Sequence, residues 1–271
     1  MDIEKIKNYN QKMLAVLSTA LALMATIGLI FLLIFLVSEF WPKPDRRTNV
    51  LLANAQVEQL KKDSLRQQII SYGSPSLIDT NNLIYIFPVH VKTLEDPEEV
   101  DNIEIRRGRV KLMSSSGNYY ERNYYGAFNN LVLYDYNTGI STKICETRLV
   151  GSNRKVVYFE DDIMVIFTGA EKDSNKDGVI TSSDFEMLYL YSFSDKKLRK
   201  VTLPNTTVLS HTLVGNQKDL LVKFGSDRNK DDKYQSKLEP SFLMLYNFEK
   251  GTLTKVVDEK LEKEIQSLIE N

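Results

Sequence analysis

The hydrophobic positions fall into two patterns, one continuous run near the N-terminus and a series of short alternating runs after it. Residues 13–37 include no charged side chain. At about 1.5 Å of rise per residue, a helix of that length exceeds the roughly 30 Å hydrocarbon core of a bilayer. Phe40 and Trp41 end the run with rings that suit the headgroup layer. We therefore expect one membrane-spanning helix over 13–41, after a short tail at 1–12.

A cleaved signal peptide is the alternative interpretation of this run. It fits poorly, because the apolar stretch is too long and no small-residue cleavage site follows it. Basic residues are equally frequent on both sides, so the positive-inside rule gives no orientation. Small residues recur at intervals of four within the run, at Ser18, Ala22 and Thr26. This spacing would let another helix approach closely.

The segment 42–75 reads as a helical linker beside the membrane. Residues 48–71 are rich in Gln, Lys, Leu and Ala, and Gly73 lies just beyond them, which predicts a polar helix. A heptad pattern lasts for only two repeats and then stops. A spacer helix and a short coiled coil therefore both remain open.

The alternating runs contain an internal repeat. Residues 131–136, 188–193 and 243–248 share the order leucine, apolar, leucine, tyrosine, small polar, aromatic. A turn and a second short strand follow each copy at the same spacing, so each copy predicts a β-hairpin. An apolar strand precedes each hairpin, at 83–91, 162–168 and 219–224. We expect units of three or four antiparallel strands, repeated roughly every 55 residues.

These hairpins resemble the outer strands of blades in TolB-like and WD40-like β-propellers. The resemblance covers about 80–257 and rests on short motifs. It implies a mainly β fold in which residues 76–257 form three propeller-like repeats. Propellers typically close with about 4–8 blades, so three units imply a ring shared by two chains, or an open array or sandwich. An unrelated β-meander is the alternative. Residues 258–271 predict a short amphipathic helix that docks on the β domain or on a partner.

The insert of the second unit, residues 173–184, has the spacing D-x-N-x-D-G-x-I-x-x-x-D. It resembles an EF-hand calcium loop of the dockerin kind. The resemblance implies calcium bound by side-chain oxygens, by the carbonyl of Val179, and by Thr181 directly or through water. The complete predicted set is Asp173, Asn175, Asp177, Val179, Thr181 and Asp184. Gly178 would permit the sharp turn and Ile180 would lie beneath the loop. A hydrophilic turn without metal is the alternative.

The other two units also carry inserts. The third has a worn form of the loop at 227–232, without the glycine and with Glu239 one position beyond the expected end, so we favour a solvated charged loop there. The first has a longer insert, 94–129, which is acidic, then basic, then rich in tyrosine. Equivalent inserts would gather on one rim, and exposed Tyr and Arg are favoured at protein interfaces. This rim is a candidate contact surface.

Composition adds few candidates for chemistry. The formal net charge of −1 gives no reason to expect a nucleic-acid partner. Cys145 has no cysteine to pair with in the chain, and we expect it to be a small core residue. With two histidines, no phosphate-binding loop and no G-x-S-x-G motif, the sequence predicts no catalytic site and no zinc site.

These patterns favour a non-enzymatic, membrane-anchored binding or assembly module, with the bilayer and a protein or second copy as partners. Calcium is the expected cofactor. We expect the large C-terminal domain to be extracytoplasmic, periplasmic or extracellular, because weak calcium loops fill readily only where calcium is abundant. An accessory subunit that contacts a membrane complex through its helix is the alternative. A cryptic hydrolase that uses rim carboxylates is the least favoured reading.

Overall fold

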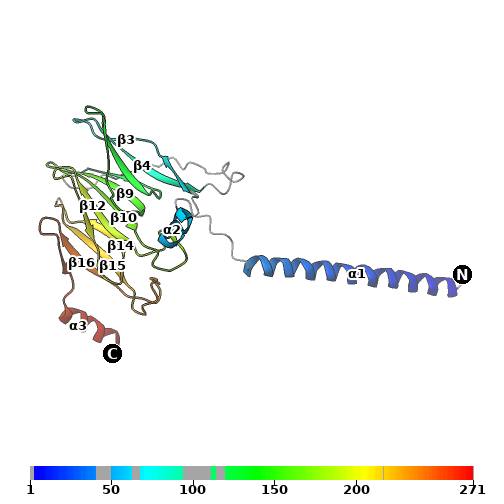
Figure 1. The fold of residues 1–271 in the computed structure, drawn as a ribbon. Coiled ribbons are helices and arrows are strands. Elements are labelled where there is room, and N and C mark those ends of the chain that lie inside the picture. Colours follow the sequence, from blue (N-terminus) through cyan, green and yellow to red (C-terminus); the bar gives the residue numbers. More distant parts are fainter. Residues whose placement is uncertain are drawn as a thin grey trace. The chain divides into compact units, whose positions relative to one another are not determined.

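A computed structural model of the chain describes residues 3–40, 50–62, 68–93, 111–113, 120–215 and 217–270. The chain divides into two compact units, 1–46 and 47–271. The first unit contains helix α1 (Ile3–Phe40), and the second is mainly β (Figure 1). A mainly β fold with several antiparallel sheets is therefore confirmed.

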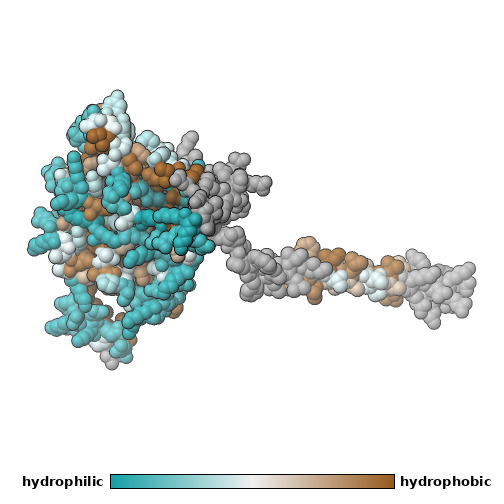
Figure 2. All heavy atoms as spheres, viewed as in Figure 1, coloured by the Kyte–Doolittle hydropathy of each residue, from teal (hydrophilic) through white to brown (hydrophobic). Residues whose placement is uncertain are grey.

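Helix α1 covers the apolar run and begins at Ile3, within the predicted tail. Its described apolar side chains are exposed, including Leu14 at 65% and Phe31 at 69% (Figure 2). Among the described residues, no helix is both long enough and apolar enough to span a membrane. The side chains at 30 and 33–37, and all of Trp41, lie outside the described residues.

The predicted linker helix ends earlier than expected. Of the described residues in 42–75, only α2 (Asn54–Lys62) is helical, between β1 (Leu51–Leu52) and β2 (Gln68–Tyr72). The prediction of a helix up to residue 71 was wrong, because Ile69, Ile70 and Tyr72 favour a strand. β2 also pairs along its whole length with β4 (Ile84–Thr93), from Gln68 opposite Thr93 to Tyr72 opposite Val89.

Outside its insert, each repeat contributes its strands to one antiparallel sheet. The first sheet has the order β2-β4-β7-β8, with β3 (Ser76–Asp79) also paired to β4, β7 at Asn130–Asp135 and β8 at Ile140–Lys143. The middle sheet contains β9 (Val150–Tyr158), β10 (Ile163–Ala170), β12 (Met187–Ser192) and β13 (Lys197–Val201). The last sheet contains β14 (Thr206–Leu213), β15 (Leu220–Ser226), β16 (Ser241–Asn247) and β17 (Thr252–Lys255). The predicted strands and hairpins are thus all present.

The insert of the first unit does not stay with its own sheet. Its described parts form β5 (Lys111–Met113) and β6 (Tyr120–Tyr124), and β6 pairs with β9 at the edge of the middle sheet. The order of that sheet is therefore β13-β12-β10-β9-β6-β5. Residues 94–110 and 114–119, with the acidic and basic stretches and Tyr119, lie outside the described residues.

Two apolar cores hold the three sheets face to face. One core joins the first sheet to the middle sheet through residues such as Ile86, Leu131 and Phe167. The other joins the middle sheet to the last through residues such as Ile166, Leu190 and Tyr246. The middle sheet is therefore covered on both faces. Within the described residues no core cluster joins the first sheet to the last, so the three sheets form an open stack.

Helix α3 (Glu259–Glu270) forms where the amphipathic pattern predicts it. Asp258 caps its start by accepting a hydrogen bond from the backbone N–H of Leu261 at 2.8 Å. The apolar side chains along it, Leu261, Ile265, Leu268 and Ile269, are all exposed. The expected docking of this helix on the β domain is therefore not seen.

Candidate functional site

The predicted calcium loop, 173–184, connects β10 to β12 and is shaped by its own oxygen side chains. Asp173 accepts a hydrogen bond from the backbone N–H of Gly178 at 2.9 Å. Asn175 accepts one from Asp177 N–H at 2.9 Å, and Asp177 accepts one from Val179 N–H at 3.0 Å. Gly178 has φ of +90°, a conformation that glycine adopts without steric cost. The three alternating oxygen residues therefore bend the chain into one tight loop.

Asp184 closes the loop from its C-terminal side. It is only 3% exposed, and its two carboxylate oxygens accept backbone hydrogen bonds from Ser174 at 2.8 Å and Thr181 at 2.7 Å. Val179 and Ile180 form the short strand β11, which pairs with β1. Ile180 is 2% exposed and packs in a small core cluster with Leu51, Val150 and Ala170, so it is buried as predicted.

The oxygen donors of this loop suit calcium by chemical type, since calcium takes carboxylate, amide, carbonyl and hydroxyl oxygens. Each oxygen of Asp173 accepts one backbone hydrogen bond and so keeps a second lone pair. The Oδ1 atom of Asp184, by contrast, already accepts three hydrogen bonds, from Ser174 N–H, the Ser174 hydroxyl and Asn175 N–H. Within the described part of the chain, however, no three His, Cys, Asp or Glu side chains are arranged to hold a metal ion. Calcium binding by the six residues therefore stays a prediction.

The worn loop of the third unit, between β15 and β16, is folded in the same way. Asp227 accepts a hydrogen bond from Asp232 N–H at 3.0 Å, as Asp173 does from Gly178. Asn229 accepts one from Asp231 N–H at 3.1 Å, as Asn175 does from Asp177. The sequence favoured a solvated charged loop here, and residues 228–231 are indeed exposed. The loop also repeats the hydrogen bonding of the first loop.

Glu239 takes the place of Asp184 in this second loop. Its two oxygens accept backbone hydrogen bonds from Arg228 at 2.9 Å and Gln235 at 2.8 Å. Glu239 lies one position later than Asp184 does in its loop, and its side chain is one methylene longer. A comparison of the two inserts that allowed one extra residue would have matched these two carboxylates.

The two loops lie next to each other. Lys176 of the first loop and Asp232 of the second form an ion pair at 2.6 Å, between Nζ and Oδ2. The expectation that the inserts gather on one rim is thus confirmed for the second and third units. Of the four tyrosines in the insert of the first unit, the structure describes those at 120, 124 and 125, which lie in and just after the strand β6.

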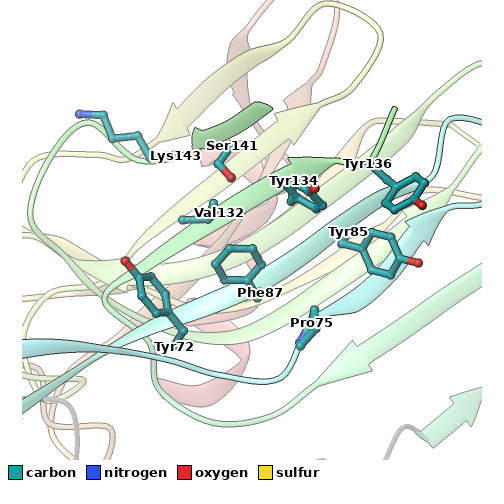
Figure 3. A pocket seen from close by; sticks show the side chains of 9 residues that line it. All are labelled: Tyr72, Pro75, Tyr85, Phe87, Val132, Tyr134, Tyr136, Ser141 and Lys143. Atoms are coloured by element: carbon teal, nitrogen blue, oxygen red, sulfur yellow. The ribbon is translucent and has the colours of Figure 1, made fainter. Parts of the chain in front are cut away.

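A groove with aromatic walls covers the outer face of the first sheet, which is the face turned away from the middle sheet (Figure 3). It encloses about 780 Å³ and is lined by Tyr72, Pro75, Tyr85, Phe87, Val132, Tyr134, Tyr136, Ser141 and Lys143. The rings of Tyr72 and Phe87 meet edge to face with 5.8 Å between their centroids. Tyr72 and Tyr136 are 62% and 63% exposed, so the groove is open to solvent.

Sequence reasoning did not single out this groove, although a signal was present. An antiparallel sheet with one solvated face carries polar residues on that face. The first sheet instead carries apolar residues on both faces. In β4, Tyr85 and Phe87 lie on the outer face, and Ile86 between them lies on the face that packs against the middle sheet. In β7, Val132 and Tyr134 likewise lie on the outer face, and Leu133 between them lies on the packed face.

The strand registers show which positions of the three sheets are equivalent. Phe87 is opposite Val132 in the first sheet, and Phe167 is opposite Tyr189 in the middle sheet. Val222 is opposite Met244 in the last sheet. In the middle and last sheets these pairs are buried against the preceding sheet. The groove therefore lies on the face of the first sheet that is equivalent to the buried faces of the middle and last sheets. In the first sheet this face is not covered by another sheet.

Buried titratable groups lie outside the groove. Burial, together with Glu171, raises the pKa of the Cys145 thiol to about 12, so the thiol stays protonated, and its expected place in the core is confirmed. Burial, together with Lys155, lowers the pKa of His211 to about 4. Burial also raises the pKa of Glu186, although the Ser152 hydroxyl donates a hydrogen bond to its carboxylate at 3.0 Å.

The six predicted ligands thus lie along one ordered loop, a matching loop lies beside it, and an aromatic groove occupies a separate face. Comparisons with models of protein families, with curated proteins and with solved structures find no match to this chain.

Proposed function

We propose that this chain is a membrane-anchored binding or assembly module that engages a protein through the groove of its first sheet. The observation that carries the proposal is the uncovered face itself, whose residues have equivalents that are buried in the other two sheets. Contiguous exposed apolar surface is a mark of interaction sites. Tyrosine is favoured there because it combines a large apolar ring with a polar tip.

The shape of the groove favours a protein over a small molecule. Pockets for small ligands usually enclose about 70–90% of the ligand surface. Here the lining side chains stand on one face of a sheet, and the tyrosines at both ends are mostly exposed (Figure 3). A second apolar surface laid against the sheet would cover all of these side chains at once. The hydroxyl groups of the tyrosines would remain at its edge, in contact with water.

Photo-crosslinking in native membranes tests this proposal. We would place a photoreactive phenylalanine analogue at Tyr134 in the groove, and at Tyr125, which is 59% exposed and outside it, as the matched control. We expect a discrete crosslinked protein band from position 134 only, and we expect Tyr136→Lys to suppress that band. Equal crosslinking from both positions, or no effect of Tyr136→Lys, would remove the groove as the binding surface.

The anchor is the second part of the proposal. The uncharged run 13–37 and the exposed apolar side chains of α1 support it. The hydroxyls of the run also bond within the helix, from Ser18 to the carbonyl of Ala15 at 2.9 Å and from Thr26 to that of Leu23 at 2.8 Å. A helix that satisfies its own polar groups suits a hydrocarbon environment. Release of the full chain from membranes by alkaline carbonate would contradict this part.

Calcium binding by the loop 173–184 and an extracytoplasmic domain complete the proposal. A ligand that binds only the folded state raises its melting temperature with ligand concentration. We expect calcium, and not magnesium, to raise the melting temperature of the full chain in detergent, and Asp173→Ala to abolish the rise. Asp227→Ala is the matched change in the second loop. No shift at millimolar calcium would reduce the first loop to a turn and remove the argument for orientation.

An accessory subunit that contacts a membrane complex through α1 is the second candidate. It is supported by the small residues Ser18, Ala22 and Thr26, whose spacing of four places them along one side of the helix. Replacing all three by leucine would block close approach of another helix. Retention of the native complex by that variant would exclude this candidate.

A further inference from the structure

The two interfaces inside the stack are built by one rule. At each of them, the earlier sheet contributes aliphatic side chains from the first and third positions of the repeat motif. These are Leu131 and Leu133 against the middle sheet, and Leu188 and Leu190 against the last sheet. All four are at most 8% exposed. The face that looks toward the next sheet is thus a leucine face.

The later sheet contributes the second and fourth positions of the same motif. These are Tyr189 and Tyr191 in the middle sheet, and Met244 and Tyr246 in the last sheet. Their neighbours on the adjacent strand add further rings, and Phe167 stacks on Tyr189 with 4.9 Å between centroids. In both internal interfaces a leucine face therefore meets a face that contains aromatic rings.

Each end of the stack presents one of the two kinds of face that meet in the internal interfaces. The groove of the first sheet presents the second and fourth motif positions, Val132 and Tyr134, with no sheet packed against them among the described residues. The outer face of the last sheet presents the first and third positions, Leu243 and Leu245. Leu243 is 42% exposed, and Leu209 on the same sheet is 39% exposed.

We infer that the groove binds the outer leucine face of the last sheet of a second copy, so that chains stack head to tail. This inference rests on the proposed function and names its partner. A groove-to-groove pair would place tyrosines against tyrosines, a combination that neither internal interface uses. A head-to-tail contact closes into a ring if the rotation allows it, and otherwise continues as a filament. Two chains in a ring would contain six sheets, within the range in which propellers close, about 4–8.

Disulfide trapping between two differently tagged full chains in detergent micelles tests the inference. One chain carries Tyr134→Cys in the groove and the other carries Leu243→Cys on the leucine face. The wild-type chain is the control, because its single cysteine, Cys145, is 1% exposed and its thiol stays protonated. We expect a disulfide-linked pair in the mixture, and none from either variant alone beyond the wild-type level. Tyr136→Lys in the groove chain should abolish the linkage, with an unchanged melting temperature showing that this variant is folded.

The other outcomes separate this inference from the proposed function. Linkage of Tyr134→Cys with itself would show groove-to-groove pairing, which overturns the head-to-tail contact and keeps the groove as a binding surface. Absence of any linkage, with a Tyr134-specific photo-crosslink to a different protein in membranes, would overturn the second copy as partner and keep the proposed function. Absence of both linkage and photo-crosslink would overturn both.

Discussion

The first sheet and the middle sheet carry the same alternation of residues but end in different surroundings. Tyr189 of the middle sheet is 2% exposed beneath the first sheet, whereas the aromatic face of the first sheet remains open. The local sequence determines that each segment is a strand and which side chains share a face. It does not determine whether that face is covered, because covering depends on the place of the sheet in the stack.

Truncating the equivalent phenylalanines of the first and middle sheets gives the largest expected effect. Phe167→Ala opens a cavity between two sheets and should lower the free energy of unfolding by about 3–5 kcal/mol. Phe87→Ala, at the equivalent position in the groove, should cost about 1 kcal/mol or less in the dilute full chain, because little apolar area is lost from a packed interior. Denaturant unfolding in mild detergent measures both values.

The dependence of the stability cost of Phe87→Ala on protein concentration distinguishes the groove further from the buried interface at Phe167. If a second copy covers the groove, the cost should rise with protein concentration, since association stabilises the folded state by mass action. Phe167→Ala should cost the same at every concentration. Equal costs for both variants in dilute solution would mean that the groove is already covered within one chain.

The stability of the interface between the middle and last sheets should depend on pH through His211. Burial, together with Lys155, lowers the pKa of this imidazole to about 4 in the folded chain from its ordinary value of 6.5, while Glu121 acts in the opposite direction. Below pH 6.5 the unfolded chain therefore binds a proton that the folded chain rejects. Stability should fall as the pH falls from 6.5 to 4, by up to about 3 kcal/mol at 1.36 kcal/mol per pKa unit.

The variant His211→Gln separates the contribution of this imidazole to stability from that of carboxylates that titrate in the same pH range. In His211→Gln the fall in unfolding free energy between pH 6.5 and pH 4 should be smaller than in the wild type by the same amount. Parallel curves for the two proteins would mean that the imidazole accepts a proton in the folded state. Denaturant unfolding at a series of pH values makes the measurement.

Sequence alone predicted the repeat well, because its signal is local. Alternation of leucine and tyrosine over six residues predicts a strand wherever it occurs, and all three copies are strands. Pairing between strands that are distant in the sequence is not local, and two such pairings were missed. Ile69 and Ile70 were assigned to a helix, yet they pair with β4, and β6 leaves its own repeat to pair with β9.

The acidic loops show the same limit at the level of a site. A fixed spacing selected the six residues of the first loop, but it placed Glu239 one position beyond the expected end of the second. The longer side chain of Glu239 spans that extra residue. The groove escaped notice for a different reason. An apolar residue such as Phe87 is expected in any strand, and only the strand register shows that it shares an uncovered face with Val132.

The two loops offer a smaller and closely matched comparison. Asp184→Ala and Glu239→Ala would each leave two buried or partly buried backbone N–H groups without an acceptor, at a cost of about 1–3 kcal/mol. We expect similar losses in unfolding free energy when both variants are measured with chelator present. A loss confined to Asp184→Ala would show that the second loop contributes no stability of its own. Added calcium should then widen the gap between the two variants only if the first loop alone binds it.

The ion pair between the loops should have the smallest effect of all. The side chains of Lys176 and Asp232 are 79% and 44% exposed, so water screens the pair on both sides. Their contact raises the pKa of the Lys176 ammonium, but that group already carries its charge at neutral pH. We expect Lys176→Ala to leave the unfolding midpoint within experimental error at physiological salt, and Asp232→Ala to do the same. A double-mutant cycle with significant coupling would mean instead that the two loops are held as one rigid surface, and the coupling should then decrease as salt is added.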